Sequence, residues 1–270
     1  MIRFEHVTRS YGSRVAVDQL DLSVAKGELL ALLGHNGAGK TTSLKMIVGL
    51  LRPSSGRVSV NGYLVTDHPR ETSKLIGYVP DQPYLYEKLS GREFLEFVGE
   101  MYGLTSAEVR EGVGRESERF QLVEFLDQLT ESYSHGMRQR TVFAAAMMHQ
   151  PEVLIVDEPM VGLDPHSIRM VKDLLREYVS QGKTVLMSTH TLSVAEEIAE
   201  LVELSIAEVK QSLKNSGRHV SMDAPLIDGE DSNLYDVMGS EESPSPDSSL
   251  ILESLREEIS RALDTLTPRE

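Results

Sequence analysis

The chain has 270 residues and a formal net charge of -15, and it contains no cysteine. This length suffices for a sizeable hydrophobic core, and the acidic charge, without a cluster of Lys and Arg, argues against a nucleic-acid-binding surface. The lack of cysteine excludes a disulfide framework and thiolate zinc sites, and it favours a reducing compartment such as the cytosol.

Short apolar and β-branched runs predict strands at residues 2–7, 15–24 and 57–60, and Asn61-Gly62 predicts a hairpin turn after the last of them. A continuous apolar run at residues 28–33 leads into a Gly-rich loop and then into a helical pattern from Lys40 to Leu50. This order is typical of a buried parallel strand that feeds a helix. We therefore expect an α/β layer that begins with this strand.

The middle of the chain has helical periodicity. Ser90 with Glu93, and Thr105 with Glu108, have the spacing of capping boxes that begin two helices. The apolar residues of the first helix are expected on one face: Phe94, Leu95, Val98, Met101 and Tyr102. Strand-like runs resume only at residues 153–156 and 184–187, so residues of about 84–132 are predicted to form a helical insertion. Asp164 and Pro165 predict the start of a further helix, which Gly182 ends.

The C-terminal region has a different composition. Residues 205–249 are predicted to be an acidic linker, rich in Ser and Pro, that cannot bury enough apolar surface to fold alone. Residues 250–266 carry apolar side chains at helical spacing and predict one amphipathic helix. We expect this tail to be largely disordered, and the chain beyond about Ser221 to be dispensable for nucleotide binding.

A phosphate-binding motif follows the predicted strand at residues 28–33. Residues 34–41 match GxxxxGK[ST], in which glycines allow backbone N–H groups to converge on phosphate oxygens. Lys40 is expected to reach the β- and γ-phosphates, Thr41 to bind Mg²⁺, and Thr42 to donate near the α-phosphate. The nucleotide-binding residues predicted here are Gly34, Asn36, Gly37, Ala38, Gly39, Lys40, Thr41 and Thr42.

Two acids and a histidine follow the later predicted strands. Asp157 and Glu158 end the apolar run at residues 153–156, where a parallel sheet would place them beside the phosphate loop. Asp157 is predicted to hold Mg²⁺, and Glu158 to polarise the attacking water. His190 follows the strand at residues 184–187; taken alone it fits a structural role as well as a catalytic one.

The order of these motifs resembles that of the ATP-binding cassette (ABC) ATPases over residues 1–204. The resemblance implies an α/β fold with a P-loop NTPase core, an antiparallel β subdomain and a helical insertion. It also implies that Tyr11 stacks on adenine and that Lys40, Glu158 and His190 are catalytic. Residues 133–137 match the family's signature motif, with His135 at the first glycine. In the family, Ser134 and Gly136 would cap the ATP of a second protomer.

Two further family motifs follow from the same resemblance. The Q-loop, which senses metal and water, falls at Asp81 or Gln82, and the sequence leaves the choice between them open. Residues 161–164 match the D-loop, which in relatives lies across the dimer interface. Residues 205–270 fall outside the resemblance.

The resemblance implies an ATP- and Mg²⁺-dependent ATPase subunit of an ABC transporter, similar to those of ABC-2-type exporters. It would work as a homodimer or heterodimer beneath integral membrane permease subunits, on the cytoplasmic face of the membrane, without nucleic acid as a partner. The apolar group Tyr84, Leu85, Tyr86 and Leu89 is a candidate docking surface, or it packs inward. The alternatives are a soluble ABC ATPase outside transport and a nucleotide-binding regulator with low turnover.

Overall fold

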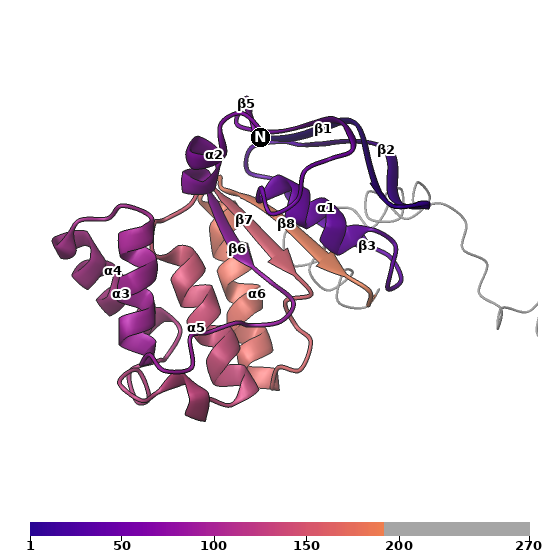
Figure 1. Ribbon diagram of the computed structural model, residues 1–270. Coiled ribbons are helices and arrows are strands. Elements are labelled where there is room, and N and C mark those ends of the chain that lie inside the picture. The colour runs from indigo at the N-terminus through magenta and orange to yellow at the C-terminus, as the bar shows by residue number, and fades with distance from the viewer. Residues whose placement is uncertain (192–270) are drawn as a thin grey trace, which may run out of the picture. The chain divides into compact units, whose positions relative to one another are not determined.

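Two β-sheets organise residues 1–191, the part of the chain that the computed structural model describes (Figure 1). The antiparallel sheet has the order β2-β1-β4-β5. Its strands are β1 (Ile2–Tyr11), β2 (Arg14–Val24), β4 (Ser55–Val60) and β5 (Tyr63–Leu64). The parallel sheet has the order β3-β8-β7-β6. Its strands are β3 (Leu29–Leu33), β6 (Ile76–Val79), β7 (Val153–Asp157) and β8 (Thr184–Thr189). The predicted strands are confirmed, whereas the predicted linker and C-terminal helix lie outside the described residues.

The parallel sheet lies between two hydrophobic cores, which explains why its strands are apolar on both faces. On β7, Val153 and Ile155 pack in the core shared with the antiparallel sheet and α1 (Lys40–Ile47). Leu154 and Val156 of the same strand pack in the core on the other face, which includes side chains of α5 (His135–Met147) and α6 (Pro165–Ser180). Side chains that alternate along one strand therefore join both halves of the molecule.

The remaining helices are α2 (Pro69–Leu75), α3 (Gly91–Met101) and α4 (Ser106–Arg119), with a 3₁₀ turn at Thr130–Ser132. In Figure 1, α3 and α4 lie beside α5, on the opposite side of the parallel sheet from β1 and β2. Both predicted capping boxes are present, at Ser90 and at Thr105. The chain from α3 to the 3₁₀ turn is thus the helical segment expected between β6 and β7.

The hairpin turn and one expected face of α3 can be compared directly with the structure. Asn61 and Gly62 both have positive φ, 50° and 83°, as a two-residue hairpin turn requires. Met101, predicted on the apolar face of α3, is 72% exposed, so this assignment was wrong. It ends the helix and lines a hollow with Arg70 and Lys74 of α2, so its neighbours there are polar side chains and not the core.

We predict that Gly77→Ala destabilises the fold. A Cβ at Gly77 in β6 would lie 2.6 Å from the carbonyl oxygen of Ala146 and 2.8 Å from Pro151 Cγ, both closer than van der Waals contact. The expected loss is about 1–3 kcal/mol, as for other overpacked cores. The free energy of unfolding in urea measures it.

Gly114→Ala is the matched control, because Gly114 lies in α4 and a Cβ there meets nothing within 4 Å. Replacing a helical glycine by alanine should stabilise the protein by about 0.5–1 kcal/mol. Equal stability of the parent and Gly77→Ala would contradict the close packing of β6 on the end of α5.

Candidate functional site

Three strand ends of the parallel sheet meet at one edge. Leu33 of β3 is in register with Thr189 of β8, and Asp157 of β7 is in register with Ser188. The backbone N–H of Gly34 donates to Thr189 O at 3.3 Å, so the phosphate loop leaves the sheet beside β8. The register therefore gathers the loop, the two acids and His190 although they are far apart in sequence.

The phosphate loop requires glycine at two positions. Gly37 and Gly39 have φ values of 85° and 88°, in the left-handed region that favours glycine. A Cβ on Gly39 would lie 2.4 Å from the carbonyl oxygen of Ala16, so this residue also allows β2 to approach the loop. The loop ends in α1, whose first residue is Lys40.

Lys40 joins the loop to Glu158. Its Nζ donates to Gly34 O at 2.5 Å and to His35 O at 3.2 Å, and it lies 3.6 Å from Glu158 Oε1. The side chains of Lys40 and Glu158 are only 9% and 15% exposed, so solvent screens this ion pair less than one at the surface. His190 Nδ1 lies 2.9 Å from the other oxygen, Oε2, of Glu158. The Glu158 carboxylate is thus oriented from two sides.

Asp157 and Glu158 face different surroundings although they are adjacent. Glu158 has φ of 49°, and its N–H donates to Ser188 Oγ at 3.1 Å. The Ser188 hydroxyl in turn donates to Asp157 Oδ1. Asp157 is fully buried, and its Oδ2 has no hydrogen-bond partner among the described residues. A buried, unpartnered carboxylate oxygen is costly unless a cation or donor satisfies it, so Asp157 fits a metal ligand.

The oxygen donors at this edge suit Mg²⁺. Among the described residues, no group of three His, Asp or Glu side chains could hold a metal ion by itself. Mg²⁺ is usually held by one or two carboxylates together with substrate phosphates and water, so the buried Asp157 carboxylate and the Thr41 hydroxyl fit such an ion. Burial, together with the charges of Asp157 and Asp81, raises the pKa of Tyr78, whose neutral hydroxyl adds no charge to this site.

A cavity of about 400 Å³ opens over the phosphate loop. Nine predicted site residues line it, namely Tyr11, Asn36, Gly37, Gly39, Lys40, Thr41, Thr42, Asp81 and Glu158. Gln82, the other candidate for the Q-loop position, is not among the lining residues, and neither are Gly34 and Ala38. The fold thus brings Tyr11 of β1 and Asp81, which follows β6, to the same cavity as the loop.

Ser134 and Gly136 lie outside this cavity. Ser134 caps the N-terminus of α5, and its Oγ accepts from Met137 N at 3.3 Å. A Cβ on Gly136 would lie 3.5 Å from Asp164 Oδ2, and His135 Nε2 lies 3.4 Å from Val161 O. The signature segment therefore packs beside residues 161–164, and neither Ser134 nor Gly136 lines the cavity of its own chain.

Sequence reasoning missed four residues of the site. Arg14 and Ala16 of β2 line the cavity, and Ser188 holds Asp157 and Glu158. Arg9 places its guanidinium carbon 4.7 Å from the centroid of the Tyr11 ring, within cation–π range. Arg9 and Arg14 lie close to Tyr11 in the sequence, and this proximity could have predicted that they belong to the site. No pattern in the sequence indicated the strand register that brings Ser188 to Asp157.

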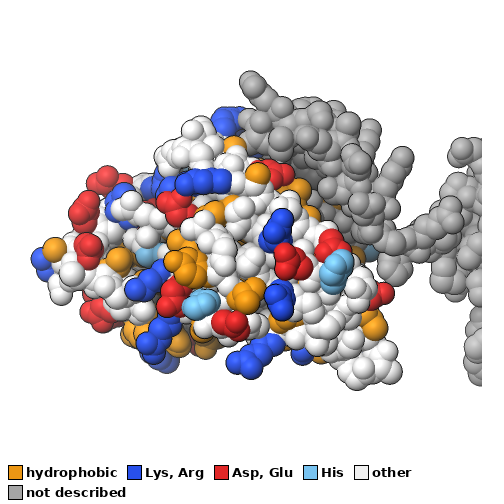
Figure 2. All heavy atoms as spheres, turned by 90° about the horizontal axis from the view of Figure 1, so that it is seen from above, with side chains coloured by type: hydrophobic (Ala, Val, Ile, Leu, Met, Phe, Trp, Pro, Cys, Tyr) orange, Lys and Arg blue, Asp and Glu red, His pale blue; other side chains and the backbone are white. Residues whose placement is uncertain are grey.

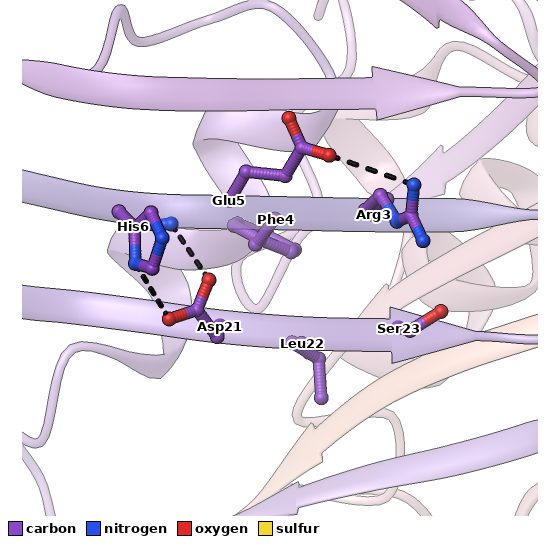
Figure 3. A pocket seen from close by; sticks show the side chains of 7 residues that line it. All are labelled: Arg3, Phe4, Glu5, His6, Asp21, Leu22 and Ser23. Carbon is purple, nitrogen blue, oxygen red and sulfur yellow. Dashed lines mark hydrogen bonds and ion pairs between the residues drawn. The ribbon is translucent and has the colours of Figure 1, made fainter.

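A larger hollow, of about 590 Å³, crosses β1 and β2 but contains no predicted site residue. Its polar side chains pair with one another: Arg3 with Glu5, and His6 with Asp21 (Figure 3). His6 has φ of 47°, and both its backbone N–H and its Nδ1 contact the Asp21 carboxylate. These contacts stabilise a bulge in β1. The larger of the two hollows is therefore explained by strand structure, and size alone does not identify the functional cavity.

This chain is similar to proteins of a known family. The family described as "ABC transporter" matches residues 17–161. The chain is 33% identical over 268 residues to Nod factor export ATP-binding protein I of Cupriavidus metallidurans, covering 99% of this chain and 81% of that protein. It is 36% identical over 202 residues to linearmycin resistance ATP-binding protein LnrL of Bacillus subtilis, covering 75% of this chain and 65% of that protein.

A solved structure has the same fold. The ATP-binding cassette MJ0796, as a dimer in a post-hydrolysis state bound to ADP and Pi, is similar with a TM-score of 0.66 and 25% identity. The match covers 74% of this chain and 91% of that one. A second family, described as "Sigma-70 region 3", matches residues 194–250, which lie outside the described residues. The two family matches do not overlap, so the C-terminal segment has a separate resemblance.

We predict that Gly39→Ala weakens ATP binding at least about tenfold, because a methyl group at φ of 88° both strains the loop and collides with Ala16 O. Isothermal titration calorimetry with ATP measures the affinity, and circular dichroism checks the fold. The control is again Gly114→Ala in α4. Parent affinity in Gly39→Ala would show that the loop tolerates a side chain there.

Proposed function

Because this chain belongs to the ABC transporter family and is an ATP-binding subunit that hydrolyses ATP, we propose that it drives an ABC-2-type exporter through closure of an ATPase dimer. The observation that carries the proposal is that Glu158 lines the cavity together with Lys40 and pairs with both Lys40 and His190, next in sequence to the buried Asp157. The export role is supported by relatives whose names refer to Nod factor export and linearmycin resistance. Residues 1–204 would form the ATPase domain.

ATP is bound by backbone and side chains together. The loop from Gly34 to Gly39 presents N–H groups at the start of α1, where a helix N-terminus favours negative charge. Lys40 is within reach of both the loop and Glu158, and it would neutralise phosphate charge. Tyr11 would stack on adenine with one ring face, since Arg9 already lies against its ring.

Thr41 and Asp157 would hold Mg²⁺, and Asp81 would sense it, because Asp81 lines the cavity and Gln82 does not. When bound, the ion offsets charge on the phosphates. Ser188 positions Asp157 by donating to one carboxylate oxygen, which leaves the other oxygen free for the ion.

Hydrolysis follows from the orientation of Glu158. Its carboxylate would accept a proton from water as the water oxygen attacks the γ-phosphorus and the bond to the bridging oxygen breaks, giving ADP and phosphate. His190 contacts Glu158 Oε2 through both Nδ1 and its backbone N–H, so it is a positioning residue for the carboxylate. Lys40, 3.6 Å from the other oxygen, would stabilise the negative charge of the leaving phosphate.

The signature segment supports a composite site. Ser134 and Gly136 begin α5, where a helix N-terminus can accept an anion, yet both lie outside their own cavity. They would therefore bind the ATP held by the loop of a second ATPase subunit. Closure of two subunits on two ATP molecules then supplies the mechanical step, and hydrolysis by Glu158 resets it.

Permease subunits would dock on the loop before α3. Tyr84 and Tyr86 are 74% and 47% exposed and contact each other edge to face, while Leu85 is buried beneath them. Tyr86 also contacts Phe97 of α3, which is itself exposed, so these three rings form one aromatic patch. Exposed aromatic clusters are typical of interfaces. No helix among residues 1–191 is long and apolar enough to span a bilayer.

The surface disfavours the alternative of a nucleic-acid-dependent ABC ATPase. In the face seen in Figure 2, acidic, basic and apolar side chains are interspersed, without one large basic patch. A nucleic-acid footprint would need clustered Lys and Arg. The proposed location is the cytoplasmic face of the membrane, where the permease subunits would hold the chain.

We predict that Glu158→Gln binds ATP normally but hydrolyses it at least about a hundredfold more slowly, since the amide keeps the shape of the side chain and loses its basicity. Malachite-green phosphate release measures turnover, and size-exclusion chromatography with Mg-ATP should show accumulated dimer. Glu124→Gln, an exposed glutamate away from the cavity, serves as the control. Parent turnover in Glu158→Gln would remove Glu158 from the proposed role.

A second prediction concerns the aromatic patch. Replacing Tyr84 and Tyr86 together by Asp should leave ATP hydrolysis by the isolated subunit unchanged and reduce co-purification with the permease subunits at least about tenfold, because two exposed rings would be lost from the interface. Val123→Asp, at another exposed apolar residue, is the control. Undiminished co-purification of the double variant would place the docking surface elsewhere.

A further inference from the structure

Arg14 is a second cation in the nucleotide cavity, and it comes from outside the phosphate-loop motif. It begins β2, lines the cavity of about 400 Å³, and its Nη2 lies 3.5 Å from the position of a Cβ on Gly37. We propose that Arg14 binds the phosphate chain of ATP from the Gly37 side of the loop and offsets the charge of Asp81. This inference rests on the proposed function and adds a binding residue to it.

The two cations of the cavity have different surroundings. Lys40 is held by two loop carbonyls and lies close to Glu158, so part of its charge is already compensated inside the protein. The Arg14 side chain makes no hydrogen bond or ion pair with any of residues 1–191. Its planar guanidinium has five N–H donors, a geometry that suits phosphate oxygens. The donors of Arg14 are therefore available for a ligand beside Gly37.

The charges that line the cavity give Arg14 a specific task. They are the carboxylates of Asp81 and Glu158 and the cations of Arg14 and Lys40. Two acids and two bases balance, whereas without Arg14 the acids would outnumber the bases at a site that must accept a polyanion. Asp81 adds a negative charge to this cavity that a neutral side chain would not. Arg14 restores the balance, since like charges close to a phosphate chain weaken its binding.

An adenine-binding role for Arg14 is the main competing explanation. Arg14 lies at the same end of the β1–β2 hairpin as Tyr11, which is in register with it. However, Tyr11 already has a guanidinium against its ring, that of Arg9 at 4.7 Å. The Arg14 guanidinium, whose Nη2 lies 3.5 Å from the position of a Cβ on Gly37, is instead beside the loop that is proposed to hold phosphate. The two roles differ in which part of ATP they affect, so adenosine, which lacks phosphates, distinguishes them.

The test compares Arg14→Gln with the parent chain by calorimetric titration of ATP and by a competition assay with adenosine, at low and high ionic strength. We expect ATP to bind about tenfold more weakly to Arg14→Gln, with adenosine affinity unchanged and the difference smaller at high salt. Arg57→Gln, an exposed arginine on β4 that does not line the cavity, should bind ATP like the parent. Parent affinity for ATP in Arg14→Gln, or an equal loss for ATP and adenosine, would overturn the proposal.

A double variant tests the link to Asp81. Adding Asp81→Gln to Arg14→Gln should recover most of the lost ATP affinity, because the cavity then again has equal numbers of acids and bases. No recovery would overturn the charge-balance part of the proposal. Lys40→Ala distinguishes failure of this inference from failure of the proposed function. If the parent chain binds no ATP, or if Lys40→Ala binds ATP as tightly as the parent, the proposed function itself is contradicted. If only Arg14→Gln behaves like the parent, the role of Arg14 alone is contradicted.

Discussion

Ser188 and Asp157 face each other in register on β8 and β7, and a hydrogen bond joins their side chains. The rest of the site depends on this pairing. Because successive side chains of a strand point to opposite faces, a slip of one residue would turn Asp157 to the other face of the sheet. It would also separate Ser188 from Glu158, whose backbone N–H donates a hydrogen bond to the same hydroxyl. One serine thus fixes both acids relative to the phosphate loop.

The change of direction between the two acids has a backbone cause. Asp157 is the last residue of β7 and is fully buried, whereas Glu158 adopts φ of 49°, a conformation that costs a non-glycine residue about 1–2 kcal/mol. Contacts to Ser188, Lys40 and His190 hold it there. Strain of this kind persists only where surrounding contacts over-determine it, and it is concentrated at functional sites. The turn leaves the Asp157 carboxylate buried and directs the Glu158 side chain to the cavity.

Local sequence predicted those parts of the site that are local in structure. The phosphate loop is one continuous segment, and the capping boxes at Ser90 and Thr105 are contained within four residues, so motif spacing was sufficient for all three. Whether Asp81 or Gln82 lines the cavity depends on the path of the chain after β6, because the sequence of a loop does not fix the direction in which each side chain points. The exposure of Met101 also depended on its neighbours, since helical periodicity predicts a face but not what covers its last turn.

Residues contributed across the fold were the least predictable. Arg14 reaches the cavity only because β2 folds back along β1 and Gly39 lets β2 lie against the loop. Neither condition can be predicted from the sequence of the eleven-residue strand that begins with Arg14. The same limit applies to the signature segment, whose placement beside residues 161–164 follows from how α5 packs and not from its own sequence. Sequence motifs therefore identified the chemistry, and tertiary packing decided which side chains share it.

Net charge and local charge lead to different conclusions in this chain. The total of -15 disfavours polyanionic partners, yet the cavity is expected to bind a nucleotide, because Lys40, Arg14, backbone N–H groups and a helix N-terminus act within a few ångströms of it. At physiological ionic strength charges separated by more than about 8 Å are largely screened, so the charges that line the cavity influence the loop more than the total charge of the chain does. Residues 194–250 resemble Sigma-70 region 3, a family other than the one that matches the ATPase part of the chain. The expected absence of a nucleic-acid partner therefore stays a prediction, because a whole-chain charge averages segments with different resemblances.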